Sequence, residues 1–319
     1  SSILWRFERH GTHRPVVTIT ACPTLRGVEF QQTVPELPEV ETVVRTLAPL
    51  IEQRIIVGFD RKWKRVLGNV TLPALRSALQ GRRIVRATRR AKFVILELDD
   101  ASRLALHLRM TGKLYPAVPE VKTKPAHISA IFHFSEGPDL IFEDQRRFGR
   151  IYYLSGSAEQ SRFFADYGPE PLDGQFNAHR FFDDLQKRKR QIKPLLLDQS
   201  FVAGLGNIYV DESLWLARIH PLQNAAGISR KSATALHGAI QKVLRNSIAS
   251  NGTTFMNFRF LGGEAGGYTD HLLVFRRQGQ PCRRCKAIIQ KIRVAQRGTH
   301  ICPHCQRLSS AASDPDMAR

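Results

Sequence analysis

Two cysteine pairs near the end of the chain constrain its fold more than any other feature. Two residues lie between Cys282 and Cys285 and two between Cys302 and Cys305, and sixteen residues separate the pairs. Two tight turns with this spacing can present four thiolates to one tetrahedral zinc ion. Such a site leaves no position for water, so we predict one structural zinc that folds a short β-hairpin. With Cys22 the count is odd, which indicates metal binding in a reducing compartment rather than a disulfide framework.

The chain also carries a large positive charge. Its 319 residues have a formal net charge of +20 and a pI of about 10.4, and residues 276–307 contain no Asp or Glu. This balance favours a partner with many phosphates, which means nucleic acid or an anionic membrane. There is no apolar run of about 18 residues and no prominent basic amphipathic helix, so we expect nucleic acid and no membrane. The alternative is a generally basic protein without such a partner.

The residue pattern changes along the chain. Residues 84–115 and 128–154 are rich in β-formers, with turn signals between them. Apolar residues occupy both faces at 93–98, which is typical of a sandwich of two sheets. After about residue 165 the pattern becomes helical, and a glycine-rich loop at 260–270 precedes the cysteines.

A helix is predicted to begin near Pro38 within the stretch QTVPELPEVETVV (residues 32–44). Proline suits the first helical turn, where Glu39 and Glu41 would also favour the helix dipole. Pro49 should kink this helix or end it early. The helix does not explain Pro35 and Glu36, which lie upstream of it.

Two further features favour a nucleic-acid groove. Gly204 and Gly206 lead into a helical pattern at Asn207, a natural N-cap, and such a turn can offer free N–H groups to a phosphate. The run KRKRQIK at 187–193 is strongly basic. A plain tight turn and a solvated charged face are the respective alternatives.

Several motifs together resemble the formamidopyrimidine-DNA glycosylases, a bacterial base-excision repair family. They occur in the family's order: PELPEVET (35–42), RRAKF (89–93), LRMTG (108–112), DQRRFGR (144–150), GPEPL (168–172), GLGNIYVDE (204–212) and the cysteine hairpin with AQRGTH (295–300). The resemblance spans residues 35–307. It implies an α+β multidomain fold, with an N-terminal two-sheet β-sandwich behind a leading helix, a helix–two-turn–helix domain and a C-terminal zinc finger. The expected domains are 35–165, 166–272 and 273–307, followed by a disordered tail at 308–319.

The resemblance also implies an activity, which is removal of oxidised purines from duplex DNA followed by strand cleavage. Pro35 would be the nucleophile that forms a Schiff base, and Glu36 the general acid/base. Lys92 would assist glycosidic cleavage, and Arg297 would bind the phosphate beside the lesion during β,δ-elimination. The implied enzyme is a monomeric, cytoplasmic bacterial protein that binds damaged double-stranded DNA and one zinc ion.

The same resemblance assigns DNA-contacting residues. Such an enzyme flips the damaged base out and fills the gap with side chains, here Met110, Arg146 and Phe148. The other expected contacts, mostly to phosphates, are His127, Arg147, Lys189, Lys193 and Asn207. The sequence departs from the family at Gln145, where proline is common, which puts the rigidity of that loop in doubt.

Two other functions stay open at this stage. An endonuclease VIII-like enzyme would remove oxidised pyrimidines, and the loop at 258–272 does not distinguish the two specificities. A catalytically inactive damaged-DNA-binding protein is the second alternative, because Pro35 is internal here and its nitrogen is an amide. We expect residues 1–34 to be a non-native or disordered extension, with Val34 read from a GUG start codon.

Overall fold

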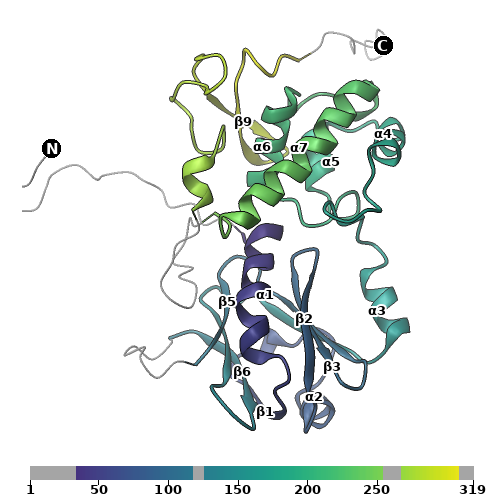
Figure 1. The fold of residues 1–319 in the computed structure, drawn as a ribbon, viewed down its shortest axis with the longest axis vertical. Helices are drawn as coiled ribbons and strands as arrows, with labels where there is room; N and C mark the ends of the chain where they lie inside the picture. The colour runs from purple at the N-terminus through teal and green to yellow at the C-terminus, as the bar shows by residue number, and fades with distance from the viewer. Residues whose placement is uncertain (1–33, 118–125, 254–266, 309–319) are drawn as a thin grey trace, which may run out of the picture. The chain divides into compact units, whose positions relative to one another are not determined.

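The computed structural model describes residues 34–117, 126–253 and 267–308 (Figure 1). The expectations for residues 1–33, for most of the loop at 258–272 and for the tail at 309–319 lie outside the described residues. Among the helices of the described ranges, none is long and apolar enough to cross a membrane.

Two four-stranded antiparallel sheets form the N-terminal part, which confirms the predicted sandwich. One sheet has the strand order β1-β6-β7-β5 and the other β2-β3-β4-β8. The strands are β1 Ile56–Arg61, β2 Ile84–Arg90, β3 Phe93–Leu98, β4 Arg103–His107, β5 Gly112–Pro116, β6 Ile128–Phe134, β7 Leu140–Asp144 and β8 Arg150–Leu154. Phe59, Phe132 and Phe142 from the first sheet and Leu96 and Leu106 from the second meet in one apolar core.

Helix α1 (Leu37–Ile51) joins this core to the next one. Pro38 lies in its first turn, as predicted, and Val40 and Leu47 point into the sandwich core. Leu37 instead belongs to the core of the helical region. The helix runs two residues beyond Pro49, so this proline lies in the last turn and does not end the helix earlier. One helix therefore packs into two cores, and the residues just before it lie where the two meet.

Helices dominate the part of the chain from residue 165 to 253, as the sequence pattern indicated. They are α4 Ala178–Gln186, α5 Ile192–Leu197, α6 Asn207–Ala217 and α7 Arg230–Ala249, with the short 3-10 turn η2 Ala225–Gly227. Helix α3 Ser157–Phe164 precedes this part, and the 3-10 turn η3 Tyr268–His271 follows it. Helix α6 is buried all round and packs against α7 (Figure 1). Tyr209 of α6 is completely buried and, with Leu236 and Ile240 of α7, lies in the centre of this core.

The predicted zinc hairpin is present as β9 (Gln290–Val294) and β10 (Arg297–Ile301). Its turn consists of Ala295 and Gln296, which both have positive φ, 46° and 61°. This is the backbone of the tight two-residue turns whose twist matches that of paired strands. Arg297 pairs with Val294 and begins β10 at the base of the turn.

Some helical segments had no counterpart in the sequence analysis. They include the 3-10 turn η1 (Lys64–Val66), helix α2 (Leu72–Leu79) and helix α3, which ends before residue 165. Helix α2 is short and buries only Leu75 and Leu79, so its apolar pattern is too brief to stand out.

Candidate active site and nucleic-acid interface

Glu36 lies buried where α1 meets α6. It is the residue before α1, and its backbone N–H donates to the Glu39 carboxylate at 3.0 Å. Its own carboxylate accepts the N–H groups of Ile208 at 2.9 Å and of Tyr209 at 3.4 Å, in the first turn of α6. Only 3% of Glu36 is exposed. Glu36, whose role α1 alone does not explain, is therefore held by first-turn N–H groups of α6 that have no partner within that helix.

The glycine turn before α6 is shaped by the residues that begin α1. A Cβ on Gly206 would lie 2.3 Å from Cδ of Glu36, and one on Gly204 would lie 2.6 Å from Cδ1 of Leu37. The N–H of Leu37 donates to the carbonyl of Gly204 at 3.0 Å. The expectation that these helix amides bind a phosphate is wrong, because the Glu36 carboxylate occupies them. Gly206, not Asn207, is the N-cap of α6.

The surroundings of Glu36 shift its acidity. Burial raises its pKa to about 7, and the nearby charge of Glu39 adds to this. Lys92 and the two α6 amides act in the opposite direction. Burial also lowers the pKa of Lys92, while Glu36 and Glu39 raise it and Arg297 lowers it further. The charges of two glutamates, a lysine and an arginine therefore act on one another, and a carboxyl group with a pKa near 7 can exchange a proton at neutral pH.

Lys92 lies in the turn between β2 and β3, directly before β3. Ala91 before it has φ +51°, and its N–H donates to the Glu170 carboxylate at 2.6 Å. Glu170 also accepts from the guanidinium groups of Arg89 at 2.6 Å and Arg90 at 2.8 Å. These bonds fix the turn that carries Lys92. In the sequence, Glu170 was marked only by its place in the GPEPL motif.

His107 is a second residue that the sequence analysis missed. It ends β4 beside Phe93, with ring centroids 4.7 Å apart, and only 9% of it is exposed. Burial lowers its pKa to about 3, and the charges of Arg109 and Lys92 add to this. Its Nδ1 accepts the N–H of Arg109 at 3.0 Å, so the neutral ring carries its proton on Nε2. Its signal was its position just before the LRMTG motif.

Three residues predicted to enter the base stack come together. An N–H of the Arg146 guanidinium contacts Sδ of Met110 at 3.1 Å, and this guanidinium lies 4.9 Å from the ring centre of Phe148. Phe148 is 47% exposed, which is unusual for a phenylalanine. The Asp144 carboxylate accepts the N–H groups of Arg146 and Gly149, and these bonds fix the backbone of the loop that carries Arg146 and Phe148.

The other predicted DNA contacts have different surroundings. Arg147 is exposed, and its guanidinium lies 4.6 Å from the ring centre of Trp63. Lys189 is exposed in the basic run, and His127 is half-buried just before β6. Asn207 is also half-buried, and its side-chain amide donates to the carbonyl of Gly298 at 3.0 Å.

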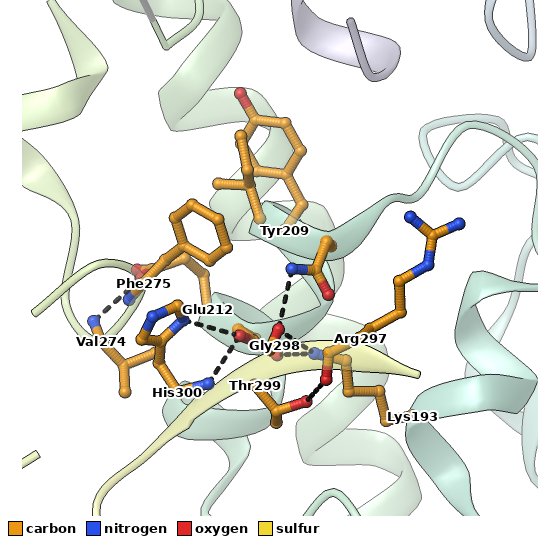
Figure 2. Close-up of polar contacts among 12 residues, drawn as sticks. Lys193, Tyr209, Glu212, Val274, Phe275, Arg297, Gly298, Thr299 and His300 are labelled. Carbon is orange, nitrogen blue, oxygen red and sulfur yellow. Dashed lines mark hydrogen bonds and ion pairs between the residues drawn. The ribbon is translucent and has the colours of Figure 1, made fainter. Parts of the chain in front are cut away.

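Lys193 does not fit its predicted role. Its side chain is 0% exposed and forms an ion pair with Asp211 at 2.6 Å. The ammonium also donates to the carbonyl of Gly298 at 3.3 Å (Figure 2). A phosphate cannot reach a side chain with no exposed surface, so the prediction of a direct DNA contact by Lys193 is wrong for this structure.

The four cysteines of the hairpin form one cluster, as predicted. All four Sγ atoms lie within 4.8 Å of one another, with 3.4 Å between Cys285 and Cys302 and 4.0 Å between Cys282 and Cys305. Tetrahedral Zn–S bonds of 2.3 Å would separate the sulfurs by about 3.8 Å. The N–H groups of Arg284 and Cys305 point at cysteine sulfurs at 3.4 Å each, an arrangement that suits thiolates. The donor set fits one structural zinc ion.

Two adjacent carboxylates of α6 hold this zinc module to the helical region. Asp211 accepts the backbone N–H of His300 at 2.9 Å. Glu212 accepts three backbone N–H groups, those of Leu273, Val274 and Phe275, at 2.8–2.9 Å. Both acids belong to the GLGNIYVDE motif, but nothing in their spacing indicated what they bind.

Three family models match successive parts of the chain. They are the formamidopyrimidine-DNA glycosylase N-terminal domain at residues 34–151, the formamidopyrimidine-DNA glycosylase H2TH domain at 167–258, and the zinc finger found in FPG and IleRS at 279–308.

Full-length relatives agree with these models. A formamidopyrimidine-DNA glycosylase of Chloroflexus aggregans is 44% identical over 86% of this chain and 99% of its own length. One of Lactiplantibacillus plantarum is 39% identical over 86% of this chain and all of its own length. Two Lactococcus lactis Fpg structures, one with DNA containing an AP site and one with DNA containing Fapy-dG, are 37% and 38% identical. Each covers 85% of this chain, with 99% and 100% of its own chain matched, and each has a TM-score of 0.78.

Proposed function

The chain belongs to the formamidopyrimidine-DNA glycosylase family, and on this premise we propose that it excises oxidised purines from duplex DNA and then cleaves the abasic strand. The observation that carries the proposal is the cluster at the start of α1. Pro35 directly precedes a buried Glu36 whose pKa is about 7, with the charge of Lys92 close by. The solved relatives bind DNA with an AP site and with Fapy-dG, which supports the same substrate class here.

The proposed nucleophile is the amine of Pro35. The nitrogen lone pair of a proline that begins the chain attacks C1′ of the damaged nucleotide, and the bond to the base breaks. As the amine proton is lost, O4′ leaves C1′ and takes up a proton, which gives an open-chain iminium. Loss of a C2′ proton then expels the 3′ phosphate, and a second elimination expels the 5′ phosphate. This requires a chain that starts at Pro35, because the nitrogen of an internal proline is an amide.

Glu36 is the proposed acid/base for these proton transfers. A group with a pKa near the working pH can donate a proton to O4′ and later accept one. Lys92 and the neutral His107 are the proposed partners of the phosphate beside the lesion, one as a cation and one as an N–H donor. Arg297, which is exposed, is proposed to hold the phosphate that leaves in the eliminations.

The exposed loop of Arg146 and Phe148, together with Met110, is proposed to fill the gap left by the flipped base. The cation–π contact between Arg146 and Phe148 supports this, because it presents a cation and a ring as one unit. Arg147, Lys189, His127 and Asn207 remain proposed contacts to the DNA backbone, and Gln145 is exposed beside them.

The domain bounds, the monomeric state, the cellular location and the absence of residues 1–34 are also proposals. The zinc finger is expected to span 273–307, the helix–two-turn–helix domain 166–272 and the catalytic domain 35–165. The enzyme is proposed to act as a monomer on double-stranded DNA in the bacterial cytoplasm. Residues 1–34 are proposed to be absent from the active form.

A borohydride trapping assay tests the proposal. A chain that starts at Pro35 is compared with a matched chain that starts at Val34, which keeps the Val–Pro amide. Each is incubated with duplexes containing 8-oxoguanine or thymine glycol and then reduced. We expect a covalent adduct only with the first chain, and mainly with 8-oxoguanine. An adduct with thymine glycol alone would support the endonuclease VIII-like alternative, and no adduct from either chain would support an inactive damaged-DNA-binding protein.

A further inference from the structure

Lys193 of α5 and Asp211 of α6 form an ion pair whose two side chains are completely buried. A buried pair stabilises a fold no better than well-packed apolar residues unless further hydrogen bonds satisfy both charges. Here those bonds come from the zinc hairpin. Asp211 accepts the N–H of His300 at 2.9 Å, and Lys193 donates to the carbonyl of Gly298 at 3.3 Å. The two buried charges of the helical region therefore obtain these hydrogen bonds only when the hairpin packs in this position.

The same contacts converge on the backbone around Arg297. The Gly298 carbonyl accepts from both Lys193 and Asn207, and the Arg297 carbonyl accepts from the Thr299 hydroxyl at 3.1 Å. The turn before it is tight, because Ala295 and Gln296 both have positive φ. Figure 2 shows the Arg297 side chain extending away from the network that holds its backbone. Its guanidinium is exposed while the peptide groups beside it are fixed.

We propose that Asp211 and Lys193 are positioning residues that set the location of Arg297 relative to Glu36 and Lys92. The inference rests on the proposed function and assigns the pair a role in the elimination steps. Neither side chain touches DNA, since both are buried. The pair acts through the Gly298 carbonyl and the His300 amide, so its loss shifts the hairpin tip while the base-release groups around Glu36 stay in place.

If the ion pair only stabilised the fold, an apolar replacement that keeps the fold would leave elimination unchanged. If the pair positions Arg297, the same replacement should slow elimination. In the double variant Asp211→Leu/Lys193→Met the charges are removed and the volume is largely kept, so the protein should still fold and bind zinc. The buried His300 N–H loses its acceptor, so stability should fall below that of wild type. The donor to Gly298 is also lost. Asp211→Asn is the conservative second variant, which keeps the side-chain shape and one acceptor oxygen. Lys62→Met is the matched control, because it removes an exposed ion pair with Asp60 on the sandwich.

The experiment uses chains that start at Pro35, under single-turnover conditions, on an 8-oxoguanine duplex and on a duplex with a preformed abasic site. Base release is measured separately from the β- and δ-elimination products. For the zinc-loaded double variant we expect base release within about threefold of wild type and δ-elimination at least tenfold slower. Asp211→Asn should show the same selectivity to a smaller degree, and Lys62→Met should match wild type.

Each outcome decides between the possibilities. Wild-type protein that fails to release 8-oxoguanine overturns the proposed function and this inference with it. If wild type is active, a folded, zinc-loaded apolar variant with normal δ-elimination overturns the inference alone. Equal losses of base release and elimination in Asp211→Asn also overturn it, because they indicate a general structural defect. That variant decides the question if the double variant does not fold.

Discussion

Glu36 and Glu212 are two buried carboxyl groups with the same pKa of about 7, raised in both mainly by burial. Glu212 accepts three backbone N–H groups from residues 273–275 and is 0% exposed. Glu36 accepts two, one of them at 3.4 Å, and has the charge of Lys92 nearby. Glu212 is therefore more fully hydrogen-bonded, by the loop it holds, whereas Glu36 accepts fewer bonds and lies beside a cation. A raised pKa alone does not distinguish a catalytic group from a structural one, and the bonding partners do.

The largest expected difference between Glu36 and Glu212 is in how much their substitution lowers the enzymatic activity. In Glu36→Gln the shape is kept, and one amide oxygen remains to accept the Ile208 N–H, but the group can no longer transfer a proton. We expect base release from an 8-oxoguanine duplex to fall about 100- to 10,000-fold. Thermal stability should change little. The matched variant Glu212→Gln should lose less than tenfold in the same assay, and an equal loss in both would remove the distinction between them.

These contrasts also show how far the sequence could be interpreted. The zinc cysteines, the leading helix and most strands were predictable, because their signals are local spacings and periods. The wrong expectations concern contacts between residues far apart in sequence. The Ile208 amide in the first turn of α6 donates to Glu36, 172 residues away, and Lys193 is neutralised by Asp211 and not by a phosphate. A basic residue in a basic run gives no local sign that its ammonium is buried.

The second largest effect should be on stability and concerns Glu212. In Glu212→Ala three backbone N–H groups lose their acceptor, and each unsatisfied buried donor costs about 1–3 kcal/mol. We expect the free energy of unfolding to fall by about 3 kcal/mol or more, measured by denaturant titration of the zinc-loaded protein. Glu212→Gln is the control, because it keeps an acceptor oxygen and should lose less. An alanine variant as stable as wild type would mean that water replaces Glu212 without cost.

A smaller effect concerns the pH dependence of stability. The folded pKa of Glu212, about 7, lies above its ordinary value of 4.5. Between these values the folded state binds more protons than the unfolded state, so the stability contributed by this group is present at low pH and is lost as pH rises through about 7. From pH 6 to pH 8 the loss amounts to about 1 kcal/mol. Glu212→Gln, which cannot titrate, should therefore gain about this much stability relative to wild type across that interval.

Glu36→Gln provides the internal test of this pH effect, since the folded pKa of Glu36 is also about 7. Unfolding free energies of wild type and both variants, measured from pH 6 to pH 8, should show similar gains for the two variants relative to wild type. Both comparisons share the same zinc site, so its own proton dependence cancels. A gain for Glu212→Gln without one for Glu36→Gln would show that the charge of Lys92 keeps Glu36 ionised. The two carboxyl groups would then differ in protonation state at neutral pH as well as in their partners, and Glu36 would act first as a base.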